Sequence, residues 1–414
     1  MAWWTPATWN SGRRQAPAGE PLAVAHERAL VASLLQPLVG GNQVDLLIDG
    51  PQTYAAMLGA IDAARDHIHI ESYIVDADGP GEEFARRLAA RSRDGVQVHL
   101  LFDSIGSIGT PRAFFEALER DGALLCEYRP LRSLTALFSR KAHRRNHRKI
   151  MVVDSKVGFI GGLNITRECA AGSAPGLLAG KDDSGPGWRD SHVRVRGPVV
   201  QQLQSLFVGH WNRHARTPIA VARHAVPPEI AGPHRAAVAS TAGGRRRNPF
   251  YLALLAAVNA ARSRVWITTA YFVPPRRLLR ALQRAAERGV DVQLLLPGRS
   301  DFWAPLHAGR WHYGRLLRAG VRIHERHDTM LHAKTTVIDG LWSAVGSSNL
   351  DWRSTVHNAE ANLLVLGVPF AAEVERVFRD DVAQSRPVAL HQWSQRGMLD
   401  RAKEWLARRF EFLL

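Results

Sequence analysis

Apolar runs short enough for strands alternate with amphipathic stretches along most of the chain. The patterns typical of strands cover residues 43–48, 68–75, 96–102, 149–153, 265–273 and 334–338. The patterns typical of helices cover residues 26–38, 54–65, 82–91, 251–262 and 276–288. Strands that alternate with helices in this way indicate an α/β fold in both halves of the chain.

The second half of the chain repeats the first. The helical stretch 251–262 (YLALLAAVNAAR) matches 54–65 (YAAMLGAIDAAR), and the strand that follows each helix matches as well. An internal repeat of this length predicts two similar domains. We expect an N-terminal segment, a first domain, a linker rich in Pro and His, a second domain and an amphipathic tail, over residues 1–40, 41–215, 216–234, 235–385 and 386–414.

Both ends of the chain carry apolar side chains with two possible roles. The tail has one helical stripe, with Arg and Lys elsewhere, formed by Leu399, Ala402, Leu406, Phe410 and Leu413. This stripe can dock on the second domain or lie on a membrane, and we favour docking. The N-terminal segment contains Trp3, Trp4 and Trp9. They can sit at a membrane interface or pack on the domain surface, which we favour.

One short polar pattern occurs twice, with every residue type repeated at an offset of 185 residues. The first copy consists of His147, Lys149, Asp154 and Asn164. The second copy consists of His332, Lys334, Asp339 and Asn349. In each copy the His and the Lys are two residues apart at the start of a predicted strand, so they point to the same side.

Each copy therefore places an imidazole, an ammonium and a carboxamide on one surface. Lysine supplies a point charge, asparagine a donor, and histidine a nucleophile or proton carrier, so the set suits a cluster of anionic oxygens. The small residues 161–162 and 346–347 precede each asparagine and allow a ligand to approach the backbone. Asp154 and Asp339 stand at strand ends, and we favour a structural role in the turn for both.

A second matched block begins at an acidic residue in each half. Asp190 and Glu360 open these blocks, and a helix with Phe207 or Phe378 as a core residue follows each one. The first half carries extra residues ahead of its block, between Arg167 and Trp188, in a stretch rich in Gly, Ser and Asp. This stretch predicts a surface loop, either a lid beside the site or a simple insertion.

The composition favours an anionic partner. The 414 residues carry a formal net charge of +16 and a sequence pI near 10.8, which suits a phospholipid surface, nucleic acid or a phosphorylated substrate. The basic run 140–145, preceded by Leu134, Leu137 and Phe138, suits lipid contact or a solvated face. The two cysteines lack CxxC spacing, and no apolar run is long enough to span a bilayer, so we expect no disulfide framework, zinc site, signal peptide or membrane span.

The doubled HxKx4Dx6G(G/S)xN pattern resembles the phospholipase D superfamily. From residue 42 onward the chain is similar to one branch, the bacterial cardiolipin synthases of the type without N-terminal membrane spans. Features of that branch are IESYI at 70–74, AYFVP at 270–274, GSSNLDWRS at 346–354 and NAE at 358–360. The resemblance implies two α/β domains, each a mixed sheet flanked by helices, related by pseudo-twofold symmetry, with the active site at their interface.

The resemblance also implies chemistry through a phosphohistidine, without metal or other cofactor. By the family's pattern His147 is the nucleophile and His332 the general acid, although the near symmetry of the two motifs makes the reverse assignment an alternative. Lys149, Lys334, Asn164 and Asn349 then hold the phosphoryl oxygens. Asp190 and Glu360 match acidic positions that orient the two histidines.

The leading hypothesis is phosphatidyl transfer, in which two molecules of phosphatidylglycerol give cardiolipin and glycerol. A phospholipase D-type hydrolase is the first alternative, because water could take the same intermediate. A nuclease of the same superfamily also suits the charge, but the chain contains no recognisable nucleic-acid-binding module, so nucleic acid is not the favoured partner. A non-catalytic binder of anionic surfaces is disfavoured by two intact motifs.

The expected partners are anionic phospholipid, namely phosphatidylglycerol, and the membrane surface that contains it. Positive charge, the absence of spans and the resemblance together predict peripheral association with the cytoplasmic face of the inner membrane. The acceptor alcohol, the acyl-chain preference and the oligomeric state are left open by the sequence.

Overall fold

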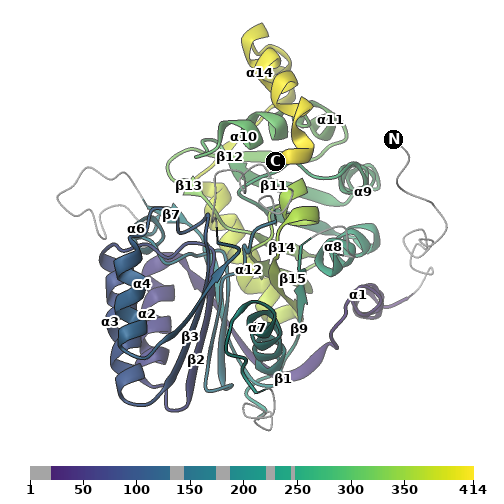
Figure 1. The fold of residues 1–414 in the computed structure, drawn as a ribbon. Helices are drawn as coiled ribbons and strands as arrows, with labels where there is room; N and C mark the ends of the chain where they lie inside the picture. Colours follow the sequence, from purple (N-terminus) through teal and green to yellow (C-terminus); the bar gives the residue numbers. More distant parts are fainter. Residues whose placement is uncertain (1–19, 131–143, 174–186, 221–228, 244–247) are drawn as a thin grey trace.

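The computed structural model describes residues 20–130, 144–173, 187–220, 229–243 and 248–414. In these ranges fifteen strands form one mixed sheet, and two further short strands, β13 (Met330–Leu331) and β7 (Trp188–Arg189), pair with each other (Figure 1). Segments from both halves of the chain thus contribute to one continuous sheet.

The strand order of one half mirrors that of the other. From the centre outward, the first half contributes β1 (Val39–Ile48), β8 (Ser191–Arg196), β6 (Val157–Gly161), β5 (Ile150–Val153), β2 (His67–Ser72), β3 (Gln97–Asp103) and β4 (Leu124–Tyr128). The second half contributes β9 (His234–Ser240), β16 (Ala361–Leu366), β15 (Trp342–Gly346), β14 (Thr335–Ile338), β10 (Arg264–Thr268), β11 (Asp291–Pro297), β12 (Arg322–Arg326) and β17 (Arg386–Pro387). This correspondence is the expected pseudo-twofold α/β architecture.

The central pair β1–β9 joins the two halves. These strands run antiparallel, with Val39 opposite Ala236 and Asn42 opposite His234. Outside them, β2, β3 and β4 are parallel to one another, as are β10, β11 and β12. The strands between are antiparallel, so each half is a mixed sheet.

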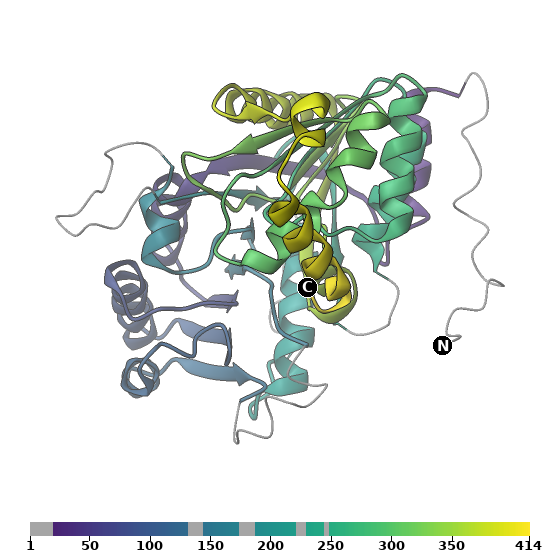
Figure 2. The ribbon, with the colours of Figure 1, turned by 90° about the horizontal axis from the view of Figure 1, so that it is seen from above.

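Helices cover both faces of the sheet in each half. The outer helices are α2 (Asp49–Asp62), α3 (Gly79–Arg93) and α4 (Arg112–Arg120) in the first half, and α8 (Pro249–Ala260), α9 (Arg276–Glu287) and α11 (Tyr313–Arg318) in the second. The remaining long helices, α7 (Val200–His214) and α12 (Val368–Ala383), pack with strands of both halves in a shared apolar core. Figure 2 shows most of the first half (purple to blue) beside the second (green to yellow), whereas the purple helix near the N-terminus packs against the second half.

The helix boundaries follow local sequence signals. Asp78 precedes α3 and accepts a hydrogen bond from the backbone N–H of Gly81, while Asn248 precedes α8 and accepts one from Tyr251. Both helices also have a proline in their first turn, where its missing N–H leaves no bond unmade. These two helices are not equivalent in the repeat, and their counterparts α2 and α9 lack a side-chain cap, so the caps explain individual helix starts and not the repeat.

Most predicted elements are present, with shifted ends. The expected helix 26–38 is α1 (Leu22–Val31), and the expected strand 265–273 is shorter, because β10 ends at Thr268. The stretch 167–188 is not wholly a loop, since it begins with α6 (Arg167–Ala171) and ends at β7. The predicted core residues Phe207 and Phe378 are buried. The domain boundaries themselves stay predictions.

Several sequence-based interpretations concern residues outside the described ranges. These are Trp3, Trp4 and Trp9, the apolar residues Leu134, Leu137 and Phe138, and the greater part of the run 140–145. Arg144 and Arg145 of that run are described: Arg144 is exposed, as the alternative of a solvated face expects, and the interpretation was wrong for Arg145. Its guanidinium is buried and pairs with Asp103 at 2.7 Å, so it faces neither lipid nor solvent.

The C-terminal helix α14 (Met398–Arg409) docks on the second half, but not through the predicted stripe. It packs against α10 (Trp303–Arg310) and buries Glu404 and Ala407. Ala407 is small enough for close packing, and the Glu404 carboxylate is neutralised by Arg396 at 2.7 Å. The predicted stripe instead faces outward, and its exposed members are Leu399, Ala402, Leu406, Phe410 and Leu413.

Candidate active site

The backbone ahead of each motif histidine is bonded to the other half of the molecule. The N–H of His147 donates to the carbonyl of Ala359 at 2.9 Å, one residue before Glu360. The N–H of His332 donates to the carbonyl of Arg189 at 2.8 Å, one residue before Asp190. Each motif is therefore anchored beside the acidic block of the opposite half, which brings both motifs to one interface.

The side chains repeat this crossed arrangement. Nδ1 of His147 lies 3.1 Å from a carboxylate oxygen of Glu360, and Nδ1 of His332 lies 2.6 Å from Oδ2 of Asp190. A carboxylate on Nδ1 fixes the tautomer and the ring orientation and leaves Nε2 available for chemistry. The sequence indicated that the two acids orient the histidines, but not that each acid serves the histidine of the other half.

The two motif lysines are buried beside their histidines. Nζ of Lys149 donates to the carbonyl of His147 at 2.8 Å, and Nζ of Lys334 donates to the carbonyl of His332. Burial lowers the pKa of Lys149 to about 7, and the positive charge of Lys334 adds to this effect while Glu360 opposes it. Burial also lowers the pKa of Lys334. Two buried cations close together form a site that favours an anion.

In the enzyme without ligand, the same buried environment favours the neutral form of both motif histidines. Burial lowers the pKa of His147, although Glu360 opposes the shift. Burial and the charge of Lys334 lower the pKa of His332 to about 4, against the opposing effect of Asp190. An anionic phosphodiester between the lysines would offset their charge, and so raise the pKa of both imidazoles.

The motif asparagines occupy equivalent buried positions. Oδ1 of Asn164 accepts a hydrogen bond from the backbone N–H of Ile74 at 3.2 Å. Oδ1 of Asn349 is buried and has no hydrogen-bond partner among the residues that the structure describes. A buried acceptor without a partner is costly, so this oxygen would be satisfied by a ligand group that donates, such as a hydroxyl.

The motif aspartates bond to turns in both halves. The Asp154 carboxylate accepts the backbone N–H groups of Arg65, Asp66 and His67 just before β2. The Asp339 carboxylate accepts the corresponding N–H groups of residues 262–264 just before β10. Both aspartates have positive φ, at 52° and 55°, in the turn between two motif strands. These contacts support a structural role.

Comparison with known proteins identifies the family. Residues 57–173 and 254–382 match the family described as "Cardiolipin synthase, PLD-like domain". The chain is 33% identical to a cardiolipin synthase of Geobacillus thermodenitrificans over 409 residues, covering 95% of this chain and 79% of that protein. It is 35% identical to cardiolipin synthase A of Pseudomonas putida over 393 residues, covering 92% and 78%.

The chain belongs to the cardiolipin synthase family. It is accordingly a phosphatidyltransferase of the phospholipase D superfamily. Its fold is also that of a phosphatidylserine synthase from Haemophilus influenzae, with a TM-score of 0.70 at 13% identity, covering 94% of this chain and 100% of that one. In the described ranges, this transferase has no helix with the length and apolarity needed to cross a bilayer.

Two serines that the sequence interpretation did not single out position Glu360 in the enzyme. The hydroxyl of Ser347 donates to one carboxylate oxygen, and that of Ser354 donates to the other at 2.8 Å. Ser354 also accepts the backbone N–H of Asn349 at 3.1 Å, from the π-helical turn Arg353–His357. The signal was present in the GSSNLDWRS segment, which identified the branch but carried no assigned role.

In the first motif, the carboxylate that contacts the histidine of the other half is positioned without a hydroxyl. Gly162 stands where Ser347 stands in the second motif, and a Cβ built at Gly162 would lie 2.1 Å from Oδ1 of Asp190. The Asp190 carboxylate is instead held by the backbone N–H of Ser191 at 2.7 Å. Glycine is therefore required at 162 by close packing.

Aromatic rings flank each catalytic candidate, a feature that spacing alone did not reveal. The ring of Tyr73 lies edge-on to His147 at 5.2 Å between centroids, and Nζ of Lys149 lies 5.2 Å from the same ring. On the other side, the ring of Trp188 lies 4.7 Å from that of His332. These rings narrow the space around the imidazoles and help to exclude water.

Proposed function

We propose that the enzyme joins two molecules of phosphatidylglycerol into cardiolipin and glycerol, through a phosphohistidine at His147. The single observation that supports this best is the pair of crossed histidine–carboxylate contacts beside two buried lysines. Such a set supplies a nucleophile, a proton carrier and a positive site for one phosphodiester.

In the first step Nε2 of His147 attacks the phosphorus of one phosphatidylglycerol. A P–N bond forms, the bond to the headgroup glycerol oxygen breaks, and His332 protonates that oxygen so that glycerol leaves. Glu360 stabilises the positive charge that the attacking imidazole acquires. Asp190 stabilises the protonated state of His332, whose pKa the bound diester raises.

In the second step the terminal hydroxyl of another phosphatidylglycerol attacks the same phosphorus. His332 takes back the proton of this hydroxyl, the P–N bond breaks, and cardiolipin leaves. Lys149 and Lys334 offset the charge on the equatorial oxygens in both transition states, and Asn164 and Asn349 donate to these oxygens. No group outside the two motifs and their carboxylates is needed for the proton balance.

Transfer is favoured over hydrolysis by the burial of the site. The side chain of His332 is only 5% exposed and that of His147 only 13%. Few water molecules can therefore reach the intermediate, whereas a second lipid displaces them as it binds.

The first experiment incubates the purified enzyme with phosphatidylglycerol vesicles and a chelator, and measures lipids by mass spectrometry. We expect cardiolipin and equimolar glycerol, both lost in His147→Ala and in His332→Ala. Phosphatidic acid in place of cardiolipin would identify a hydrolase. No turnover of phosphatidylglycerol by the wild type would reject the proposal.

A second substrate separates the roles of the histidines. A phosphatidyl ester of p-nitrophenol has a leaving group that needs no proton, so its first step does not depend on a general acid. His332→Ala should retain a burst of p-nitrophenol, and His147→Ala should show none. The opposite result would exchange the two roles.

We further propose that the enzyme binds the anionic cytoplasmic surface of the inner membrane through its C-terminal region. The apolar side chains of Leu399 and Trp405 are 79% and 52% exposed on α14, among the basic residues Arg401 and Lys403. Apolar groups among basic ones suit the interface of an anionic bilayer. The reducing side of the membrane suits the two free, buried cysteines.

The last turn of the chain, which follows α14, packs near the active site. The ring of Phe412, on the last turn of the chain, packs on Trp352 and on His357, with 5.4 Å between centroids in each case. Trp352 lies three residues after Asn349, so a bilayer at this surface would lie close to the phosphate site.

Flotation with vesicles tests the membrane proposal. The double variant Leu399→Ser/Trp405→Ser should bind phosphatidylglycerol vesicles at least tenfold more weakly, since each buried side chain contributes about 1.5–3 kcal/mol. Ile230→Ser is the matched control, because this side chain is 85% exposed but lies ahead of β9. Equal flotation of the two variants would exclude α14 as the contact, and binding to phosphatidylcholine vesicles as tight as to phosphatidylglycerol would exclude the role of charge.

A further inference from the structure

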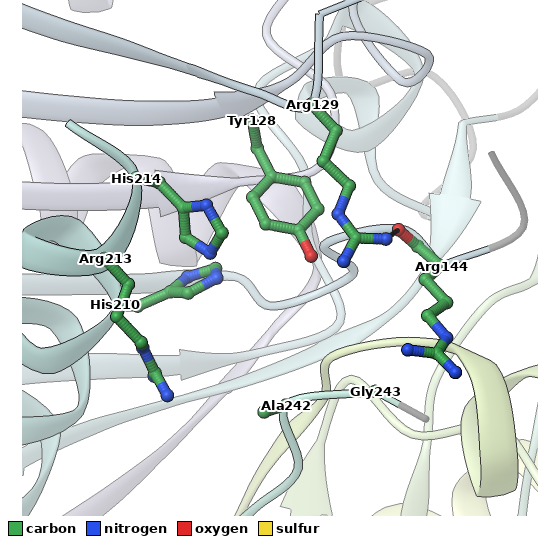
Figure 3. Close-up of a pocket in the computed structure, with 8 residues that line it drawn as sticks. All are labelled: Tyr128, Arg129, Arg144, His210, Arg213, His214, Ala242 and Gly243. Carbon is green, nitrogen blue, oxygen red and sulfur yellow. Dashed lines mark hydrogen bonds between the residues drawn. The ribbon is translucent and has the colours of Figure 1, made fainter. Parts of the chain in front are cut away.

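A second cationic site lies apart from the histidine pairs, at another point of the junction between the halves. It is a cavity of about 230 Å³ bounded by side chains from the end of β4, the segment before the first motif and the last turns of α7 (Figure 3). The polar side chains that line it are Tyr128, Arg129, Arg144, His210, Arg213 and His214. The function proposed above uses none of them.

The charge of this lining is one-sided. Among the described residues, three guanidinium groups and two imidazoles face the cavity, and no carboxylate lines it. In the described part of the chain, no acidic residue forms an ion pair with Arg144 or Arg213. Burial, together with the nearby His210, Arg129 and Arg213, lowers the pKa of His214 to about 4. The cavity therefore has a strongly positive potential.

Part of the lining is held in place by contacts among the lining residues themselves. Nη1 of Arg129 donates to the carbonyl of Arg144 at 3.0 Å, and its guanidinium lies 5.2 Å from the ring of Tyr128. The Tyr128 ring in turn packs against His210 and His214, at 5.2 and 4.8 Å between centroids. Tyr128, Arg129, His210 and His214 are thus preorganised and lose little entropy when an anion binds.

Among the described residues, only one ring nitrogen of His210 has a hydrogen-bond partner. Its Nδ1 lies 2.8 Å from Oε1 of Glu71, a buried carboxylate that also pairs with Arg148. Figure 3 shows the His210 ring beside the open space, near the Tyr128 hydroxyl. Imidazole, phenol and guanidinium groups together offer several donors converging on one anion.

We propose that this cavity is a second phosphate-binding site, separate from the catalytic one. Arginines bind phosphate oxygens in a bidentate manner, which suits a lining whose described residues include three guanidiniums and no carboxylate. The ligand is a phosphate group, carried either by an anionic phospholipid headgroup or by a small soluble phosphate. A volume of about 230 Å³ accommodates a phosphate with a short polar substituent and not an acyl chain.

The backbone that closes the cavity connects it to the catalytic histidine. Ala242 and Gly243 line the cavity, and the preceding residue, Thr241, exchanges two hydrogen bonds with Glu360. One runs from the Thr241 N–H to the Glu360 carbonyl at 2.9 Å, the other from the Glu360 N–H to Oγ1 of Thr241 at 3.1 Å. An anion in the cavity would brace the segment that holds Glu360, and Glu360 orients His147. This coupling to turnover rests on the proposed function, whereas phosphate binding does not.

The binding test follows the imidazole signals of His214 by NMR in the full-length enzyme during titration with inorganic phosphate. A bound anion should raise the pKa of His214 by about one unit or more, because it offsets the neighbouring positive charges. Arg213→Gln and Arg144→Gln should each weaken this response at least tenfold. Arg280→Gln, an exposed arginine on α9, is the matched control and should respond like the wild type.

Two further experiments identify the source of the phosphate and distinguish the cavity from the catalytic site. Glycerol 3-phosphate tests a soluble ligand, and phosphatidylglycerol vesicles test a headgroup; a response to vesicles alone assigns the site to lipid. Lys149→Met, which alters only the catalytic site, should leave the His214 response intact. If neither soluble phosphates nor vesicles change the His214 signals, or if Lys149→Met abolishes the change and Arg213→Gln does not, the proposal is overturned.

The proposed coupling between the cavity and turnover is tested by measuring kcat/KM. Arg213→Gln should lower kcat/KM for phosphatidylglycerol by about tenfold, while its melting temperature equals that of Arg280→Gln. His147→Ala should abolish turnover and still bind phosphate in the cavity, so the two proposals can fail separately. Unchanged kcat/KM in both Arg213→Gln and Arg144→Gln would reject the coupling.

Discussion

Nδ1 of His332 lies 2.6 Å from Oδ2 of Asp190, across 142 residues of sequence and across the junction of the two halves. The equivalent contact, between His147 and Glu360, crosses the same junction in the opposite direction at 3.1 Å. Neither half therefore contains a complete histidine–carboxylate pair, and the site forms only when the halves are assembled.

The two carboxylates should have separable effects on the two chemical steps. Asp190→Asn should lower kcat on phosphatidylglycerol by about 100-fold, because the protonated state of His332 loses its counter-charge. With the p-nitrophenyl ester the first step needs no acid, so the burst should return. Glu360→Gln should remain impaired on both substrates, because the loss of the carboxylate makes His147 a weaker nucleophile. Equal recovery of both variants in a stopped-flow assay would contradict this division.

Exchanging Gly162 and Ser347, which occupy equivalent positions in the two motifs, should lower kcat/KM by different amounts. Gly162→Ser places a side chain against Asp190 and displaces the carboxylate that orients His332, so we expect a loss of at least 100-fold in kcat/KM. Ser347→Gly removes one hydrogen bond to Glu360, and Ser354 still donates to that carboxylate, so about tenfold is expected. A larger loss in Ser347→Gly would show that the packing argument is wrong.

The fall of kcat/KM at alkaline pH should follow the deprotonation of Lys149. Because burial lowers its pKa to about 7, the free enzyme loses this positive charge as the pH rises through 7. Binding of an anionic diester then weakens, so kcat/KM should fall above pH 7, by up to tenfold per pH unit. Arginine stays protonated throughout this range, so Lys149→Arg should remove the limb even if its maximum is lower. A limb of unchanged position in Lys149→Arg would assign it to another group.

The motif aspartates should affect stability more than chemistry. Asp339→Ala removes the acceptor of three backbone N–H groups and of His26 Nε2 at 2.9 Å, so the free energy of unfolding should fall by about 2–3 kcal/mol. Asp154→Ala should behave similarly. Calorimetry measures the loss, and kcat/KM at 25 °C should change less than about threefold. A fully folded, inactive Asp154→Ala enzyme would give the aspartate a catalytic role.

The same contacts determine how stability depends on pH. Burial alone would raise the pKa of Asp339, but the bonds from His26 and the backbone amides outweigh it and lower the pKa below its usual value. A carboxyl whose folded-state pKa is lowered stabilises the fold above its unfolded pKa of about 3.9. This stabilisation should be lost as the pH falls below about 4, and Asp339→Ala should show a flatter acid limb than the wild type.

The sequence predicted the repeat, the α/β class and the residues of both motifs because periodicity and spacing are local. It could not predict that Asp190 contacts His332 rather than His147, since this depends on how β1 and β9 pair 192 residues apart. The serines around Glu360 were missed for a related reason. Ser354 reaches the site through a π-helical turn that no periodic pattern announces.

The tail shows how a correct pattern can lead to a wrong contact. An apolar stripe normally marks the buried face of a helix, and on α14 the buried residues are instead Ala407 and Glu404. Docking depends on the small volume of Ala407, which packs with Ala308 of α10 and Val273, whereas the ion pair of Glu404 with Arg396 lies within the tail itself. Within the basic run before the first motif, Arg145 was misread likewise, because its partner, Asp103, is distant in sequence.

The β1–β9 pairing at the middle of the sheet bears on how such a chain can arise. A chain with one repeat could build the same sheet as a homodimer, with its first strand paired to that of its twin, but symmetry would then force both histidine–carboxylate pairs to be identical. Duplication and fusion remove that constraint. The differences between Gly162 with Asp190 and Ser347 with Glu360 are ones that only a fused duplicate can accumulate. Covalent linkage thereby permits a division of labour between two histidines that began as copies of each other.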